Sequence, residues 1–119
     1  MVEYINYEGT KYPVKIANIA MKDFTAESGV AVGAIGEDLN KHALLLWHGI
    51  RVGYLKTGKN FYKNVKGKEV PVLSVKDCLW ILDDKFSVYF DILINSMANL
   101  AEIDEEVLRD AIDEQIKKK

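Results

Sequence analysis

Hydrophobic and polar residues alternate at the start of the chain. Residues 2–7 and 11–16 are rich in tyrosine and β-branched side chains, which is typical of two strands. Gly9 lies in the short turn between them, where a positive φ is tolerated. Pro13 has no N–H to donate, so the second strand is expected at an edge. A hairpin alone is marginal, and we expect the helix that follows to cover one face of it.

Helical periodicity begins after this hairpin. An apolar stripe predicts a short helix over residues 18–28, with Asn18 as its N-cap and Gly29 as a left-handed C-cap. After an apolar connector, a longer helix is predicted over residues 37–57, with two acidic residues in its first turn. This helix is apolar on many sides, so it is expected to be central or to meet a partner.

Two glycines lie four residues apart in the longer helix, Gly49 and Gly53. This spacing permits another helix to approach closely. In a soluble protein the same spacing is more often incidental.

The second half of the chain begins with a polar segment. Residues 59–73 are rich in lysine, asparagine and glycine, and they predict an exposed loop. Residues 74–77 form an imperfect capping box that starts the next helix, because an aspartate stands where a glutamate or glutamine would reach back better. The apolar stripe over residues 75–100 indicates one helix or two, with a break near residues 83–84. A last helix is predicted from residue 104 to the end, with acids in its first turn and lysines in its last.

These elements predict a single α+β domain, mainly α, with an N-terminal β-hairpin packed on a small bundle of about four to five helices. The length of 119 residues suits one domain. Its parts are the hairpin with two helices (1–58), the exposed loop (59–73) and the C-terminal helices (74–119).

Composition narrows the function classes. The net charge of −2 removes the strongest signature of a nucleic-acid binder, a large positive excess. Cys78 is the only cysteine, so no intrachain disulfide is possible, and a reducing compartment is expected. No apolar run approaches the roughly 20 residues that span a bilayer. We therefore expect a cytoplasmic protein without a membrane partner.

A search for catalytic chemistry finds no converging set of residues. His42 and His48 lie six residues apart, on nearly opposite sides of the predicted helix, so they cannot share a metal ion. Cys78 stands among apolar residues that suit a buried, inert thiol. The acidic pair Asp83 and Asp84 is explained equally well by a solvated helix end. We expect no catalytic site, no metal and no cofactor; an enzyme built on the acidic pair and His48 is the weakest alternative.

The lysine-rich segment 59–73 is the one stretch with nucleic-acid character, because it combines positive charge with Phe61 and Tyr62 as stacking faces. Solvated loop lysines are the commoner explanation, and no nucleic acid is expected.

Order and spacing in the first half carry a family resemblance. The segment "YEGTKYPVKIANIAMKDFTAESGVAVGAI", followed by "EDLNKHALLLWHGIRVGYLKTG", resembles the tail assembly chaperones of long-tailed, siphovirus-like bacteriophages and prophages. Its elements are a short G-K-x-Y-x-hydrophobic motif, a helix that carries a phenylalanine and ends near glycine, and an acidic start to a leucine-rich helix. The resemblance extends from residue 4 to residue 58, about half of the chain; the segment 59–73 has no counterpart in it.

The resemblance implies a non-catalytic function. Such chaperones are made from the gene that precedes the tape-measure gene; they coat the tape-measure protein and recruit tail-tube subunits around it. They act in the cytoplasm of the bacterial host and are absent from the mature virion. The implied partners are thus the tape-measure protein and the tail-tube protein, and a homo-oligomer is possible. The alternative is a small structural virion protein such as a head–tail connector.

A catalytically empty helical domain must work by contact, so two apolar stripes are candidates for holding a partner helix in a groove. The alternative for both is the protein's own core, which is favoured for the central helix and equally weighted for the last helix. The candidate partner-binding residues are Leu44, Leu45, Leu55, Val107, Leu108, Ala111, Ile112 and Ile116.

Overall fold

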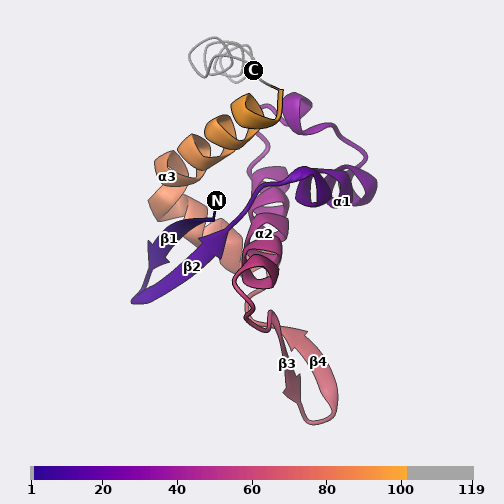
Figure 1. Ribbon diagram of the computed structural model, residues 1–119, viewed down its shortest axis with the longest axis vertical. Helices are drawn as coiled ribbons and strands as arrows, with labels where there is room; N and C mark the ends of the chain where they lie inside the picture. Colours follow the sequence, from indigo (N-terminus) through magenta and orange to yellow (C-terminus); the bar gives the residue numbers. More distant parts are fainter. Residues whose placement is uncertain (1, 102–119) are drawn as a thin grey trace.

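The protein folds into three α-helices and two β-hairpins over residues 2–101, the part of the chain that its computed structural model describes. Figure 1 shows α1 and α3 packed against α2, with the hairpins at the periphery. This architecture confirms the predicted α+β class, mainly helical. The described residues hold three α-helices instead of four to five, and the helix predicted from residue 104 lies outside them. In chain order the elements are β1 (Glu3–Tyr7), β2 (Thr10–Val14), α1 (Asn18–Ser28), the 3₁₀ helix η1 (Val32–Ala34), α2 (Leu39–Lys56), β3 (Tyr62–Val65), β4 (Lys68–Pro71) and α3 (Val75–Ala101).

The N-terminal hairpin forms as predicted. β1 and β2 pair antiparallel, and the turn between them places Glu8 and Gly9 at positive φ values of 48° and 78°. Two successive positive φ values define a turn whose twist matches that of the strands. Ile5 and Val14 are buried. The strands contact α2 and α3, so these helices cover the hairpin instead of the expected α1.

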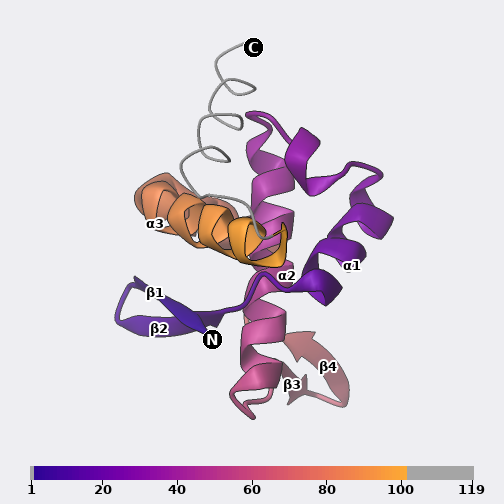
Figure 2. The same ribbon diagram turned by 45° about the horizontal axis from the view of Figure 1, so that its top comes forward.

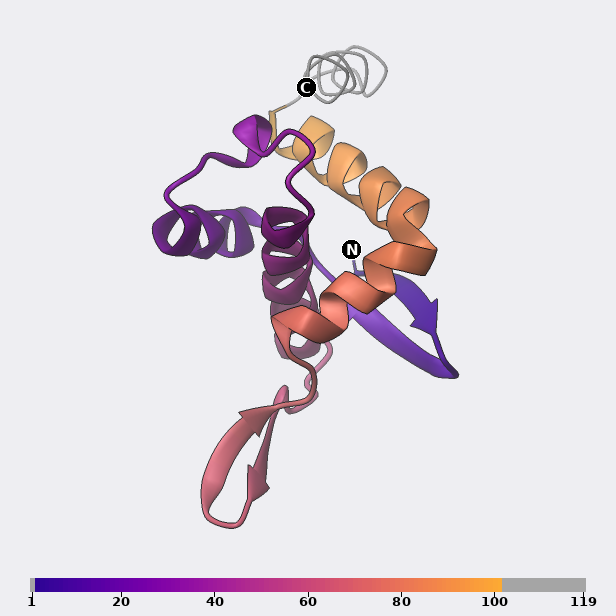
Figure 3. The same ribbon diagram turned by 180° about the vertical axis from the view of Figure 1, so that it is seen from behind.

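α2 is the central helix of the fold. It contacts α1, α3 and β2, and Figures 2 and 3 show it between α1 and α3 from two directions. A helix apolar on several sides has to be enclosed in this way to keep its side chains from water. Its buried residues are His42, Ala43, Leu45, Leu46, His48, Gly49, Ile50, Val52 and Gly53.

The glycine pair of α2 marks the place where the chain after β1 crosses the helix. A Cβ at Gly53 would overlap the carbonyl group of Pro13, and one at Gly49 would lie 3.1 Å from a side-chain carbon of Ile16. The backbone N–H of Lys15 donates to the carbonyl oxygen of Gly49 at 2.9 Å. The spacing thus permits close approach of a strand, whereas the sequence suggested a second helix or no approach at all.

The two ends of α1 differ in how well the sequence predicts them. Asn18 is not the N-cap: Ala17 holds that position in an extended conformation and makes no side-chain hydrogen bond there. Gly29 is the left-handed C-cap that was expected, with φ of 75°, and its N–H donates to the carbonyl oxygen of Thr25 at 2.8 Å.

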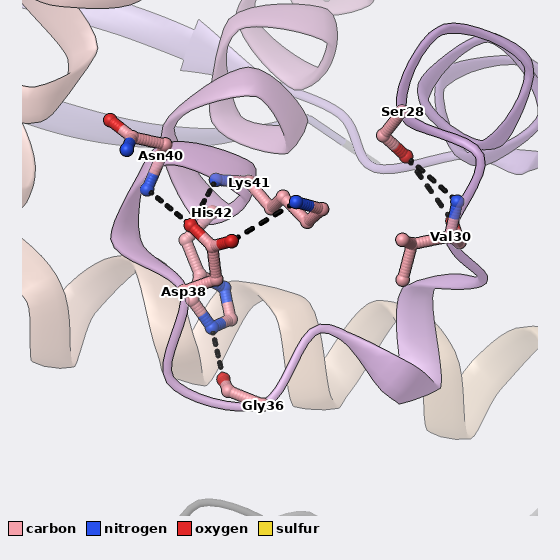
Figure 4. A network of polar contacts seen from close by, with 7 residues as sticks. All are labelled: Ser28, Val30, Gly36, Asp38, Asn40, Lys41 and His42. Atoms are coloured by element: carbon pink, nitrogen blue, oxygen red, sulfur yellow. Dashed lines mark hydrogen bonds and ion pairs between the residues drawn. The ribbon is translucent and has the colours of Figure 1, made fainter.

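α2 begins at a side-chain cap. The Asp38 carboxylate accepts hydrogen bonds from the backbone N–H groups of Asn40 and Lys41, at 3.1 and 3.3 Å, and the Lys41 ammonium lies 3.0 Å from its other oxygen (Figure 4). These donors lower the pKa of Asp38. Asp38, which was expected in the first turn of the helix, therefore lies one residue before it and serves as its N-cap.

α3 starts with a complete capping box. The Asp77 carboxylate accepts from the Ser74 N–H at 2.7 Å, and the Ser74 hydroxyl oxygen accepts from the Asp77 N–H at 3.1 Å. Asp77 therefore reaches the Ser74 N–H, although its side chain is shorter than the glutamate or glutamine that usually fills this position. The helix runs on to Ala101 but kinks at Lys85, where φ is −122° and ψ is 26°. The break expected near residues 83–84 is thus a kink in one helix.

The segment predicted as an exposed loop is a β-hairpin. β3 and β4 pair antiparallel around Lys66 and Gly67, whose φ values are 51° and 82°. The side-chain oxygen of Asn64 accepts from the Gly67 N–H at 3.0 Å and supports the turn. The exposure was predicted correctly for residues 62–70, all of which are exposed, but Phe61 and Leu73 at the ends of the predicted segment are buried, and the strands were missed. We call residues 62–71 the arm; Figures 1 and 3 show it projecting from the end of α2.

The base of the arm is anchored in the core. Phe61 is buried and meets the rings of Trp47 and Tyr54 edge-to-face, with centroids 5.3 and 5.5 Å apart. The Val72 N–H donates to the Phe61 carbonyl oxygen at 2.8 Å, and the Trp47 indole N–H donates to the Leu73 carbonyl oxygen at 2.9 Å. Aromatic contacts and hydrogen bonds thus hold both ends of the arm against α2.

The close contact between Gly53 and Pro13 predicts that Gly53→Ala destabilises the protein. In a helix without a neighbour, Gly53→Ala would stabilise the protein by about 1 kcal/mol. Overpacking against β2 costs about 1–3 kcal/mol, and the Cβ here would overlap backbone, which cannot rotate away. A backbone overlap puts the cost toward the upper end of this range, so we expect a net loss of about 1–2 kcal/mol in the free energy of unfolding, measured by urea denaturation. Gly33→Ala is the control, since a Cβ there meets nothing within 4 Å. A stabilised Gly53→Ala variant would contradict the crossing.

Candidate protein-binding surface

Both nitrogens of the His42 ring are engaged inside the protein. Nε2 lies 2.8 Å from the Gly36 carbonyl oxygen (Figure 4), and Nδ1 lies 2.8 Å from the Tyr89 hydroxyl. The carbonyl can only accept, so Nε2 carries the proton and the Tyr89 O–H donates to Nδ1. Burial lowers the pKa of His42, and the ring is neutral at pH 7. His42 links α2 to α3 and to the turn between η1 and α2, which is a structural role.

His48 belongs to a polar cluster between α1 and α2. Its Nε2 lies 3.3 Å from a Glu27 carboxylate oxygen, and Arg51 lies 3.4 Å from its Nδ1. Arg51 also donates to the Asp23 carboxylate at 2.7 Å. Burial and then the Arg51 charge lower the pKa of His48, while Glu27 and Asp23 act in the opposite direction. These contacts hold α1 against α2 and leave both ring nitrogens of His48 occupied.

Cys78 is buried, and burial raises the pKa of its thiol to about 12. A thiol with this pKa stays protonated at neutral pH and is a poor nucleophile. Among residues 2–101, no group of three or more histidine, cysteine, aspartate or glutamate side chains is placed to hold a metal ion. In the same part of the chain, no helix has the length and apolar character needed to cross a bilayer.

The predicted partner-binding residues are placed in different environments. Leu45 is fully buried and belongs to the core, so it cannot meet a partner. Leu44 is partly buried and packs against the same core. Leu55 is 66% exposed at the end of α2. The remaining five candidates lie outside the described residues: Val107, Leu108, Ala111, Ile112 and Ile116.

Leu55 lies at the edge of an open groove of about 580 Å³. The groove runs between the end of α2 and one side of the arm, and it combines the exposed Leu55 and Tyr62 with a rim of polar groups. We call it the arm groove. Its lining residues are Arg51, Leu55, Lys59, Asn60, Phe61, Tyr62, Asn64 and Glu69.

The arm has two chemically distinct faces. Tyr62 pairs with Pro71 and Asn64 pairs with Glu69, and opposite residues of a hairpin share a face. This face lines the arm groove. The other face alternates two exposed valines with two lysines and ends at the Lys66 turn; we call it the basic face. It consists of Lys63, Val65, Lys66, Lys68 and Val70.

A second hollow, of about 420 Å³, lies between the tip of the first hairpin and the start of α3. Its most exposed aromatic side chain is Trp80, at 60%, which is unusual for a tryptophan. Two carboxylates line it and no lysine or arginine does, so we call it the acidic hollow. Its lining residues are Tyr7, Glu8, Tyr12, Val72, Leu73, Asp77, Trp80 and Ile81.

Sequence reasoning missed both surfaces for identifiable reasons. The arm was hidden because its lysines and asparagine suggested a loop, yet Lys66-Gly67 repeats the residue–glycine turn of Glu8-Gly9. That repeat was a usable signal for a second hairpin. Trp80 lies in a stretch of apolar residues, so nothing in the sequence separates it from its buried neighbours. Its exposure follows from which sides of α3 the rest of the fold covers.

The two buried histidines predict a pH dependence of stability. Both folded-state pKa values lie below the unfolded value of 6.5, so the unfolded chain binds more protons just below that pH. The free energy of unfolding is therefore expected to be highest above about pH 6.5 and to fall as the pH drops toward the folded-state values. Urea denaturation at pH 7.5 and 5.5 measures the difference.

The contribution of His42 can be isolated with a paired variant. His42→Leu with Tyr89→Phe removes the titrating ring together with the hydroxyl that serves it, and should reduce the loss between pH 7.5 and 5.5. His48→Gln should keep the His42 part of that loss. An NMR titration in which His42 protonates at the pH of free histidine would contradict the neutral, buried ring.

The arm groove and the acidic hollow both have the composition of a protein-binding surface. The arm groove offers exposed apolar side chains with a polar rim, and the acidic hollow offers aromatic rings with carboxylates. Both descriptions fit a surface that recognises another protein. Comparison of the chain with protein-family models, with curated proteins and with solved structures gave no match.

Proposed function

We propose that the protein is a non-catalytic binding module that acts as a phage tail assembly chaperone, holding the tape-measure protein in the host cytoplasm and helping to recruit tail-tube subunits. The observation that carries the binding role is the arm groove beside the exposed Leu55. The choice of partner is supported by the sequence resemblance over residues 4–58.

The groove suits a partner helix on physical grounds. An amphipathic helix binds by placing apolar side chains, spaced three or four residues apart, into a hydrophobic groove. The exposed Leu55 and Tyr62 supply the apolar contact, with the buried Phe61 beneath them, and Tyr62 and Asn64 add hydrogen-bonding groups at the rim. A tape-measure protein is long and helical, so it presents many such stretches. A repeated, moderate contact with each copy of the chaperone would cover its length.

The polar groups of the groove are compatible with reversible binding. Arg51 is tied to Asp23, and the groove's other charges lie at its rim on Lys59 and Glu69. Rim charges affect the rate of association more than the affinity. A chaperone that is released when the tail tube assembles needs a contact of this kind.

The test is co-expression of the chain with the tape-measure protein encoded beside it. We expect a soluble complex with the wild type and its loss with Leu55→Asp, because a charge would be placed in the apolar part of the groove. The loss should be at least tenfold in affinity, measured on the purified proteins by calorimetry. Leu39→Asp is the matched control, since Leu39 is 54% exposed at the opposite end of the same helix.

Three outcomes would contradict the proposal. They are an insoluble tape-measure protein in the presence of the wild type, equal binding by the Leu55→Asp and Leu39→Asp variants, and recovery of the chain in purified virions. The last result would favour the head–tail connector.

A further inference from the structure

We propose that the basic face of the arm binds the acidic hollow of a second copy of this chain. The surfaces involved are those defined above, and neither belongs to the arm groove. The inference therefore stands apart from the proposed function and has its own test.

The arm is a ribbon without cover. Its strands are exposed on both faces, whereas the first hairpin buries Ile5 and Val14 against helices. An isolated two-stranded hairpin is marginally stable in water and gains most from a surface that it can lie on. The basic face, with Val65 and Val70 exposed between lysines, presents the apolar area that such a surface would cover.

Charge indicates what kind of surface this is. Residues 59–71 carry four lysines and one glutamate, although the whole chain has a net charge of −2. An acidic partner is therefore favoured. The acidic hollow has Glu8 and Asp77 in its lining, and Asp83 and Asp84 follow on the exposed side of α3.

Three of these carboxylates act on one tyrosine of the hollow. Partial burial, Glu8, Asp84 and Asp83 together raise the pKa of Tyr7, which lines the hollow. The nearest basic residue of the first hairpin, Lys11, lies on the other face of β2, with its ammonium 4.5 Å from the Tyr4 ring centroid. The charged side chains that line the hollow are therefore all acidic.

The apolar chemistry also matches. Trp80 presents its ring to solvent beside Tyr7 and Tyr12, and aromatic rings of this kind attract lysine ammonium groups over their faces. The valines of the basic face can rest on the same rings while the lysines reach the carboxylates. Tryptophan is also enriched among the residues that contribute most to protein–protein binding.

Geometry directs the arm to a second copy instead of to its own chain. Val72 and Leu73 form one wall of the acidic hollow and directly follow the arm, so the hollow lies at the base of the arm that leaves it. Figures 1 and 3 show the arm pointing away from the first hairpin, whose turn forms another wall. Because each hollow adjoins the base of its own arm, two copies can exchange arms reciprocally around a two-fold axis.

The two hairpins allow a matched exchange of charges. Glu8-Gly9 and Lys66-Gly67 occupy the same positions in turns of nearly the same backbone angles. Glu8→Lys and Lys66→Glu therefore put each residue where the fold already accepts the other. The arm-reversed variant is Lys66→Glu with Lys68→Glu, and the hollow-reversed variant is Glu8→Lys with Asp84→Lys.

The experiment measures molar mass by light scattering after nuclease treatment. We expect the wild type to dimerise, with weaker association at high salt. Each reversed variant alone should be monomeric, because its arm and hollow carry the same sign of charge. An equimolar mixture should restore the dimer, since each arm then meets a hollow of opposite charge. Trp80→Ala should weaken association at least tenfold, and Lys22→Glu on α1 should leave it unchanged.

Other results would overturn the inference. They are a monomeric wild type at its highest soluble concentration, association that the nuclease abolishes, and a mixture that stays monomeric while both variants melt like the wild type. Association that the nuclease abolishes would show that the basic arm binds nucleic acid, which then holds the copies together. Assemblies of more than two copies that respond to the variants in the same way would support the contact between arm and hollow. They would show that the copies join head to tail in an open series and do not exchange arms reciprocally in pairs.

Discussion

The structure depends on the crossing of β2 over α2. At Gly53 the helix surface is bare backbone, and Pro13 lies directly on it. Proline suits this place because the contact is made by its carbonyl side and its missing N–H removes a donor that would otherwise need a partner. Two residues further on, the Lys15 N–H donates to the Gly49 carbonyl oxygen, one turn back along the helix. The two glycines thus set how close the first hairpin can lie, and α3 closes over the result.

Burial of polar groups follows from this tight arrangement. α2 is enclosed on so many sides that two histidines and a tryptophan N–H lie in or near the core, and each has a partner. The His42 ring joins a carbonyl before α2 to a hydroxyl on α3, so it fixes the distance between these elements. His48 and Arg51 do the same for α1. Such contacts specify one arrangement of the helices, where leucines alone would allow several.

The sequence was most informative where one local rule decided the outcome. Period-two alternation and Gly9 predicted the first hairpin, and Gly29 predicted a helix end, because each depends on neighbouring residues only. Asn18 failed as a cap since the chain enters α1 directly from the crossing at α2, which leaves its position to tertiary contacts. The role of Gly53 and the exposure of Trp80 depend on segments distant in the chain. Of the candidate partner-binding residues on α2, Leu55 is exposed and Leu45 is buried in the core, because burial on a helix enclosed from several sides depends on the packing of its neighbours.

The arm is nearly independent of the helical core. Its anchor consists of Phe61, the carbonyl groups at positions 61 and 73, and the rings of α2; beyond that anchor no side chain of the arm is buried. Residues can be added to the two strands in pairs, or exchanged along them, without altering the packing of the helices. Changes in the arm are therefore expected to cost little stability. In related chains we expect the arm to diverge in length and charge faster than the glycines of α2.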